Sequence, residues 1–245
     1  MYHEVEAEAP SGYGYAVSLE KFRQQIRILK QAGYVAVTLR EVVQAVQGNE
    51  KLPPKPVVVT FDDGYEGVWR NALPVLQESG MTAVLFAIAG HLGGKNSWDR
   101  QSGGPELKLM GEGEVRELLA AGWELGAHTV NHLRLTTLSL KEAEVEIRES
   151  KTLLEQKFQT PVDSFSYPYG AHSPEICAKV RKTGYTAGVT IFSSAPSVTA
   201  DPWRMRRVFP HAGDSSLTFR LKLSGPYLRL VAWRDGRRYA KKWPE

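Results

Sequence analysis

The feature that most constrains the fold is a pattern that recurs along the chain: helical periodicity ends at a glycine, and an apolar run follows within one or two residues. The glycines are Gly33, Gly80, Gly122 and Gly184, in the segments QAGYVAVT, ESGMTAVLF, AAGWELGAHT and KTGYTAGVT. Glycine just past a helix readily adopts the left-handed conformation that closes the last turn. Each occurrence therefore predicts a helix that leads directly into a strand.

Serines mark where several helices begin. Ser139 with Glu142 matches a capping box, and Ser173 precedes a proline at the first helical position. Ser18 precedes a segment whose apolar residues recur on one helical face. These positions predict helix N-termini.

Strands are predicted between the helices, and the alternation favours a parallel sheet with helices outside. The predicted strands are Tyr2–Val5, Val35–Thr38, Val57–Phe61, Ala83–Ile88, Glu124–Ala127, Ser164–Tyr167, Ala187–Thr190 and Arg207–Phe209. About seven or eight such units fit a closed βα barrel better than an open sheet. We predict one domain over residues 1–245, with the irregular segment His91–Glu106 as a loop over one end of the barrel.

Composition excludes several classes of protein. The 245 residues are 42% hydrophobic and 24% charged, which is typical of globular chains. No apolar run approaches the roughly 20 residues that cross a bilayer, and no signal peptide is visible. The chain as given is therefore consistent with the cytoplasm, and the sequence leaves its compartment open. The single cysteine, Cys177, excludes an intramolecular disulfide and is predicted to be a small core residue.

Positive charge gathers at the C-terminal end, although the whole chain carries only +4. From Arg204 onward, Arg and Lys are interleaved with Trp and Tyr. This tail is interpreted either as a solvated helix or as a peripheral contact with an anionic polymer or membrane surface. No nucleic-acid-binding motif is present, so no nucleic-acid partner is expected.

Residues with chemical potential follow the predicted strands, which is where βα barrels place their active sites. Asp62 and Asp63 follow the third strand, in VVVTFDDGY, and His128 and His132 follow the fifth, in GAHTVNH. Two adjacent carboxylates beside a buried strand repel each other and resist losing water. We therefore expect a cation to bind there, with further ligands from elsewhere in the chain.

The His-x-x-x-His spacing supplies such ligands. On a helical turn, His128 and His132 would share a face with about 5–6 Å between β-carbons, close enough to bind one metal ion. Two histidines and one carboxylate leave a position for water, which is typical of catalytic zinc. One aspartate is then expected to bind the metal, and the other to take a proton from water.

The segment SYPYG follows the sixth strand. Pro168 and Gly170 predict a tight turn, and a backbone N–H aimed into the site can hold an oxyanion. An ordinary loop is the alternative.

These motifs resemble those of the polysaccharide deacetylase family, also called the NodB homology domain or carbohydrate esterase family 4. TFDDGY is similar to the first family motif, HTVNH to its H-[ST]-x-x-H motif, and YPYG to the core of its third, while MYHEV resembles the start of many members. The resemblance covers nearly the whole chain. It implies a distorted (β/α)7 TIM-like barrel, a divalent metal with zinc as the first choice, and hydrolysis of N-acetyl, less often O-acetyl, groups on the sugars of a polysaccharide.

The resemblance also implies roles for individual residues. Asp62 would be the catalytic base, and the metal ligands would be Asp63, His128 and His132. The backbone amide of Tyr169, beside Pro168, would stabilise the oxyanion together with the metal.

Two departures from the family pattern leave questions open. The third motif often begins with an arginine two residues before the proline, where this chain has Ser166; we predict that Arg207 replaces it in space, within about 6 Å of Asp62. The last motif, Leu-x-His, which supplies the general acid, has no clean copy. His211 is the first candidate, His3 and His172 are rivals, and it is equally open that none of them serves.

The substrate class predicts a groove in which Trp98, Asp99 and Trp203 contact a sugar ring, with burial in the core as the alternative for Trp98. The expected partner is an acetylated glycan. Two other functions stay open: hydrolysis of a non-sugar C–N bond on the same scaffold, and glycan binding by an inactive relative.

Overall fold

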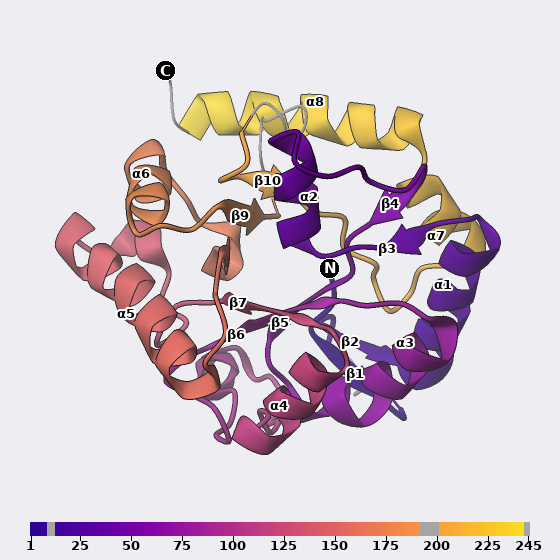
Figure 1. The fold of residues 1–245 in the computed structure, drawn as a ribbon, viewed down its shortest axis with the longest axis horizontal. Coiled ribbons are helices and arrows are strands. Elements are labelled where there is room, and N and C mark those ends of the chain that lie inside the picture. Colours follow the sequence, from indigo (N-terminus) through magenta and orange to yellow (C-terminus); the bar gives the residue numbers. More distant parts are fainter. Residues whose placement is uncertain (9–12, 192–200, 243–245) are drawn as a thin grey trace.

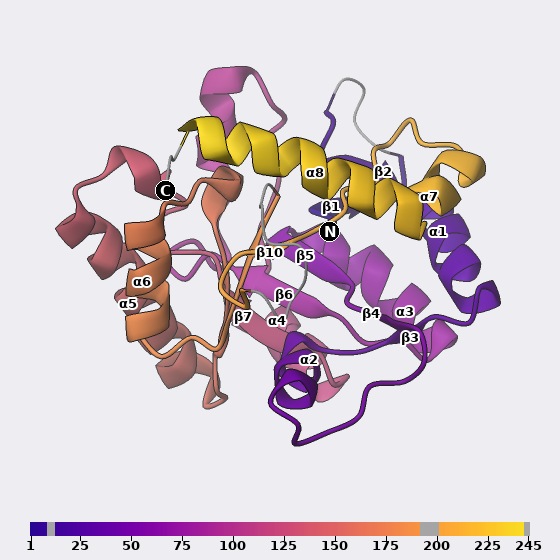
Figure 2. The ribbon, with the colours of Figure 1, turned by 90° about the horizontal axis from the view of Figure 1, so that it is seen from above.

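A computed structural model describes residues 1–8, 13–191 and 201–242. Its centre is a curved sheet of six parallel strands in the order β10-β9-β8-β7-β6-β5, with helices around the outside (Figure 1, Figure 2). The strands are β5 Thr60–Asp63, β6 Val84–Ala87, β7 Glu124–Ala127, β8 Ser164–Ser166, β9 Ala187–Thr190 and β10 Met205–Arg206. Because all six run in parallel, their C-terminal ends meet at one end of the sheet.

The first residues of the chain bridge the two edges of this sheet. Tyr2 pairs with Phe61 of β5: the Tyr2 N–H donates to the Thr60 carbonyl at 2.7 Å, and the Asp62 N–H donates to the Tyr2 carbonyl at 3.0 Å. On the other side, the Met1 nitrogen donates to the carbonyl of Val208, just past β10, at 2.9 Å. The predicted distorted (β/α)7 barrel is thereby confirmed. The N-terminal segment lies at the seam of the barrel, where the edge strands β5 and β10 come together.

Eight α-helices lie within the described ranges, and most of them pack outside the barrel. They are α1 Leu19–Gln31, α2 Leu39–Val46, α3 Leu73–Ser79, α4 Glu112–Ala120, α5 Leu140–Phe158, α6 Pro174–Lys182, α7 Ser216–Lys222 and α8 Gly225–Lys242. The predicted serine caps are confirmed, since Ser18, Ser139 and Ser173 each accept a hydrogen bond from the N–H three residues on. The glycines that end helices have positive φ, 65° at Gly80, as the sequence predicts.

Several strand boundaries differ from the prediction. The range Val57–Phe61 is divided, because β4 (Pro56–Val57) pairs with β3 (Val35–Ala36) in a separate ribbon before β5 begins at Thr60. β1 (Glu4–Glu6) likewise pairs in a separate ribbon with β2 (Ala16–Ser18), which was not predicted. Strands of two or three residues have too few alternating positions to produce a periodic signal.

The last strand was predicted too late. β10 is Met205–Arg206 and not Arg207–Phe209. The Arg207 N–H still donates to the Thr190 carbonyl of β9 at 3.0 Å, and its side chain binds Asp62. The predicted loop His91–Glu106 contains a short 3-10 helix, η2, over Ser97–Ser102.

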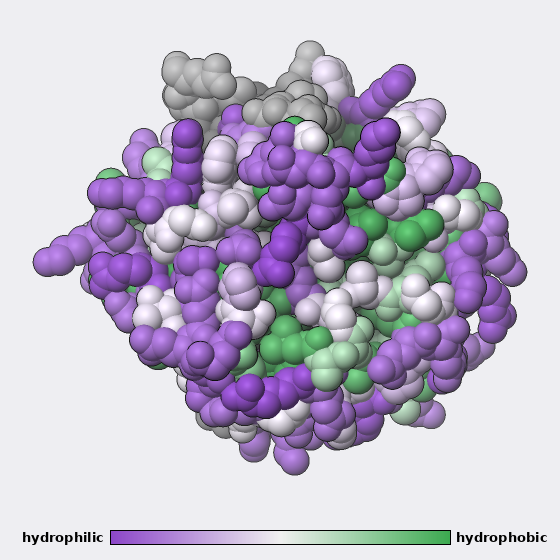
Figure 3. Space-filling view, in the orientation of Figure 1, coloured by the Kyte–Doolittle hydropathy of each residue, from purple (hydrophilic) through white to green (hydrophobic). Residues whose placement is uncertain are grey.

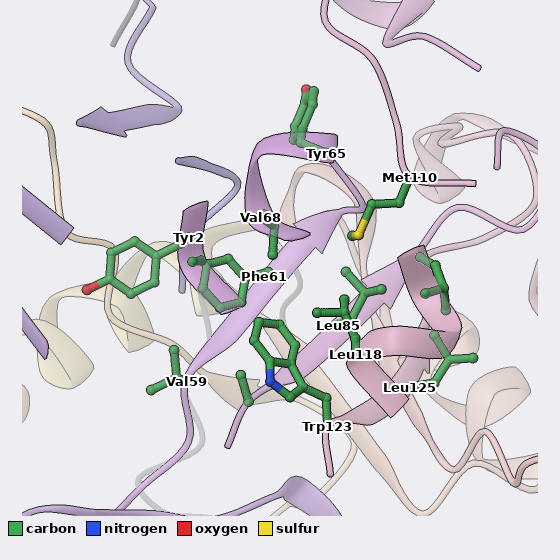
Figure 4. Close-up of a cluster of buried hydrophobic side chains, with 14 of the residues drawn as sticks. Tyr2, Val59, Phe61, Tyr65, Val68, Leu85, Met110, Leu118, Trp123 and Leu125 are labelled. Carbon is green, nitrogen blue, oxygen red and sulfur yellow. The ribbon is translucent and has the colours of Figure 1, made fainter. Parts of the chain in front are cut away.

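Alternate residues of the strands fill two apolar layers. Phe61 points outward from the barrel and stacks on Trp123 at 5.3 Å between ring centroids (Figure 4). Inside the barrel, Phe86 packs with side chains of β9 and with α2, whose Leu39 and Val43 close the N-terminal end. Gly126 is required beside Phe86, because a β-carbon there would lie 2.5 Å from the ring. The interior below the polar groups is therefore a packed core.

The basic tail forms α7 and α8, and its last residues, 243–245, lie outside the described range. Leu217 is 78% exposed on α7, and Leu230 and Trp233 are exposed on α8. The side of the molecule seen in Figure 3 is largely hydrophilic, with smaller apolar areas between the polar side chains. None of the described helices has both the length and the apolar character of a bilayer-spanning segment. Contact of the tail with an anionic surface stays a prediction.

Cys177 packs half-buried against the main core, in agreement with its predicted place.

Candidate active site

A cavity of about 460 Å³, including its open mouth, lies at the C-terminal ends of the strands. It is lined by His3, Tyr13, Tyr15, Asp62, Asp63, Trp98, Asp99, His128, His132, Tyr167, Tyr169, Gly170 and Ile191. The two aspartates of β5 and the two histidines that follow β7 therefore meet here, although up to 70 residues separate them in sequence.

Asp62 is bound by a guanidinium that comes from the other edge of the barrel. Arg207 Nη1 donates to Asp62 Oδ1, and Nη2 donates to Oδ2, both at 2.6 Å. The proximity predicted for Arg207 is therefore present. Burial favours the neutral acid, but the adjacent guanidinium outweighs it and holds the pKa of Asp62 well below its ordinary range. The carboxylate is ionised at any working pH.

Ser166 completes this group. Its hydroxyl donates to Asp62 Oδ2 at 3.1 Å and accepts from Arg207 Nη2 at 2.9 Å. Ser166, which stands where the family pattern has arginine, thus contacts both the Asp62 carboxylate and the Arg207 guanidinium. Sequence reasoning noted the departure but did not give Ser166 a role.

Asp63 faces both histidines with one oxygen. Asp63 Oδ1 lies 3.4 Å from His128 Nε2 and 3.3 Å from His132 Nε2. All three side chains are buried, yet Oδ1 has no hydrogen-bond partner among the described residues. Burial raises the pKa of Asp63, but the neighbouring imidazoles outweigh this effect and lower it.

These separations fit a metal ion. Ligand bonds of about 2.0–2.1 Å at tetrahedral angles place donor atoms about 3.3 Å apart, which matches the two measured distances. One carboxylate and two imidazoles are also a donor set that divalent transition metals prefer. Asp63, His128 and His132 therefore form a candidate metal site.

The histidines do not lie on a helical turn as predicted. The segment after β7 is a loop in which Thr129 and His132 have positive φ, 65° and 57°. Buried Glu146 of α5 holds this loop, since its Oε2 accepts the N–H groups of Val130 and Asn131 at 3.0 and 2.9 Å. A loop satisfies its own N–H groups less well than a helix, which explains why an acidic side chain is buried beside it.

The SYPYG segment forms the predicted tight turn. Tyr169 and Gly170 both have positive φ, 59° and 63°. The Gly170 carbonyl accepts from Thr190 Oγ1 at 3.0 Å and lies 2.9 Å from His172 Nδ1. His172 is buried behind the turn and is not among the residues that line the cavity.

His3 and His211 are placed very differently. His3 lines the cavity, and burial lowers its pKa, partly offset by the carboxylates of Asp63 and Asp62. His211 is exposed, its backbone N–H donates to Asp214 Oδ2 at 2.8 Å, and it is not among the lining residues. The Phe209 ring contacts both histidines, with centroids 5.7 Å from His3 and 4.7 Å from His211.

Aromatic side chains form the cavity wall. Tyr13, Tyr15, Trp98 and Tyr169 line it, and Asp99 Oδ2 accepts from the Tyr13 hydroxyl at 2.8 Å. The sequence predicted Trp98, Asp99 and Tyr169 but missed the two tyrosines of the GYGY segment, whose only signal is their spacing. Trp203 is not among the lining residues: it is partly buried against the main core, and its indole N–H donates to the Tyr185 carbonyl at 2.9 Å.

Known proteins resemble this chain in sequence. The profile of the polysaccharide deacetylase family matches residues 49–188. YxkH of Bacillus subtilis is 30% identical over 219 residues, which cover 89% of this chain and 73% of that protein. The poly-β-1,6-N-acetyl-D-glucosamine N-deacetylase of Staphylococcus epidermidis is 26% identical over 203 residues, which cover 79% of this chain and 68% of the relative.

Solved structures resemble it in fold. IcaB from Ammonifex degensii superposes with a TM-score of 0.74 at 26% identity, covering 94% of each chain. The Streptococcus pyogenes deacetylase PplD, in complex with acetate, has a TM-score of 0.78 at 23% identity and covers 91% of this chain and 96% of its own.

The sequence matches, the fold and the buried set of Asp62, Asp63, His128 and His132 all indicate the same family. The chain belongs to the polysaccharide deacetylase family and is a hydrolase of that type, acting on carbon–nitrogen bonds other than peptide bonds.

Proposed function

We propose that this protein is a metal-dependent deacetylase that removes acetyl groups from N-acetylated sugars of a polysaccharide. The observation that carries the proposal is the division of labour between two adjacent carboxylates. Asp63 faces two histidines at the spacing of metal ligands, while Asp62 faces Arg207 and Ser166. The resemblance to enzymes named for poly-N-acetylglucosamine supports a glycan of N-acetylated glucosamine as the substrate.

Asp63, His128 and His132 would hold the metal, and zinc suits this donor set best. A divalent cation bound there supplies a Lewis acid that polarises the acetyl carbonyl and lowers the pKa of water. The buried position of the three side chains strengthens their hold, since they compete with little solvent.

Asp62 acts as the general base. Its carboxylate stays ionised. Oδ2 accepts from both Arg207 and Ser166, whereas Oδ1 accepts from Arg207 Nη1 and keeps a second lone pair that can take a proton from the attacking water. Arg207 fixes the plane of the carboxylate, and its positive charge stays beside Asp62 throughout the reaction.

Two further groups of this chain complete the reaction. The Tyr169 N–H, at the strained turn, donates to the oxyanion that develops on the acetyl carbonyl. His3, and not His211, protonates the departing amine, because His3 lines the cavity.

The aromatic wall suits a sugar. Tyr13, Tyr15, Trp98 and Tyr169 present flat apolar faces around the polar floor, and pyranose rings bind such faces through their C–H groups.

The test is release of acetate from N-acetylglucosamine oligomers. We expect the zinc-loaded protein to release acetate, the chelator-stripped protein to lose this activity, and Asp62→Asn to bind zinc as tightly as wild type without turnover. Equal rates before and after metal removal would refute the mechanism. Turnover of small cyclic amides with no acetate from any glycan would instead support the non-sugar alternative.

A further inference from the structure

The two histidines of the candidate metal site are held in different ways. His128 Nδ1 lies 2.7 Å from the Ser166 carbonyl oxygen, so its ring N–H donates to the backbone and leaves Nε2 facing Asp63. His132 lacks such a bond: its Nδ1 is buried without a hydrogen-bond partner among the described residues. Ligand histidines are usually oriented by a hydrogen bond from the second ring nitrogen. Another interaction must therefore orient His132.

Aromatic packing is available for that purpose. The ring centroid of His132 lies 4.6 Å from that of Trp98 and 4.7 Å from that of Tyr169. Each partner is itself held, because the Arg134 guanidinium lies 4.4 Å over the Tyr169 ring and His91 meets Trp98 edge-on at 5.7 Å.

The packing partners come from other segments of the chain than His132. Trp98 belongs to η2 in the long loop after β6, and Tyr169 belongs to the turn after β8. The contact that its own loop makes to His132 is with the backbone: the His132 N–H donates to Thr129 Oγ1 at 2.9 Å, which leaves the ring to be oriented by other groups.

The geometry points to Trp98 and Tyr169 as positioning residues for His132, with ring packing in the role that the Ser166 carbonyl has for His128. This inference rests on the proposed metal site and adds a determinant of its affinity. If either ring is lost, the His132 imidazole gains freedom to turn, and Nε2 no longer faces Asp63 in a fixed position. Loss of an orienting partner typically weakens metal binding about 10–100-fold.

The experiment measures Zn²⁺ dissociation constants by competition with a chromophoric chelator. We expect Trp98→Leu and Tyr169→Leu each to weaken binding about tenfold. Trp98→Phe and Tyr169→Phe keep a ring against His132 and should stay within about threefold of wild type. Trp69→Leu is the matched control, because Trp69 lies apart from the cavity and donates to Glu117 at 2.8 Å; it should bind Zn²⁺ as wild type does.

A second measurement separates positioning from a role in substrate binding. With Co²⁺ in place of zinc, the visible absorption bands report the ligand geometry directly. We expect the Leu variants, and not the Phe variants, to change these bands. Thermal unfolding of the metal-free proteins shows whether each variant folds, and Trp98→Leu carries the test if Leu is not tolerated at the positive φ of Tyr169.

The outcomes distinguish the two levels of the argument. If wild type binds Zn²⁺ and folded Trp98→Leu binds it equally well with unchanged Co²⁺ bands, the positioning role is wrong while the metal site stands. If Trp98→Leu raises only the KM for glycan, Trp98 is a substrate contact and nothing more. If wild type binds no metal, the proposed function and this inference fail together.

Discussion

Arg207 and Asp62 form a bidentate ion pair across the seam of the barrel, although 145 residues separate them in sequence. The seam is where the first and last strands of the barrel meet, so the charge that balances the base arrives from the far end of the fold. Where the family resemblance leads one to expect an arginine in the third motif, this chain has Ser166 and uses Arg207, which directly follows β10.

Replacing Arg207 should therefore affect both stability and rate. Arg207→Met leaves a buried carboxylate unpaired, and we expect a loss of about 3–5 kcal/mol in the free energy of unfolding. The freed carboxylate should also become protonated near neutral pH, so kcat should fall about 100-fold. Arg207→Lys keeps the positive charge but cannot form the bidentate pair, so its stability and kcat should lie between those of wild type and Arg207→Met. Urea unfolding and steady-state kinetics measure these effects; an Arg207→Met enzyme with wild-type kcat would contradict them.

The identity of the general acid can be tested with leaving groups. His3→Ala should lower kcat about 100-fold for an N-acetyl sugar, whose amine needs a proton to depart. The same variant should keep most of its activity on an activated aryl acetate, whose phenolate leaves without one. His211→Ala should match wild type on both substrates. A His211→Ala enzyme impaired only on the amide would restore His211 as the acid.

Glu146 should be required for the loop that carries both histidines. Glu146→Ala removes the acceptor of two backbone N–H groups, and we expect it to cost about 2–4 kcal/mol in the free energy of unfolding and to weaken zinc binding. Glu146→Gln keeps one acceptor oxygen and should be milder. Chemical denaturation and zinc titration test the pair; equal stability of wild type and Glu146→Ala would show that solvent satisfies the loop instead.

Glu4 predicts an unusual dependence of stability on pH. Burial raises the pKa of its carboxyl from 4.5 to about 8, so the folded state holds a proton that the unfolded state releases. The stability linked to this proton is complete below about pH 4.5 and is lost as pH rises toward 8, by at most about 1.4 kcal/mol per pH unit. Urea unfolding between pH 5 and 8 should show the fall for wild type, and Glu4→Gln should remove this component. Parallel curves for the two proteins would contradict the prediction.

Much of the fold could be predicted from local signals. Helix ends depend on contacts within a few residues, as at the caps Ser139 and Ser173 and at Gly80. The neighbouring sequence is therefore enough to predict them. The division between β4 and β5 could not be predicted, because it depends on pairing with β3, some 20 residues earlier. Local apolar character is the same on both sides of that break.

The site shows the same limit. Asp62, Asp63, His128 and His132 are recognisable because their motifs are short and contiguous. The conformation of the His-x-x-x-His segment was predicted wrongly as helical, since spacing alone does not reveal the buried Glu146 that stabilises a loop there. Tyr13 and Tyr15 were missed because residues that line a cavity follow no sequence motif; only the folded chain shows that they lie there.

The seam has a consequence for how an active enzyme comes into being. The base, the metal-facing side chains and the oxyanion turn are all synthesised before residue 171, yet the arginine that neutralises Asp62 comes at residue 207. Until the closing strand docks, the two carboxylates repel each other without a counter-charge. We expect nascent chains that stop short of this strand to be inert, so that chemistry begins only when the ring of strands is complete.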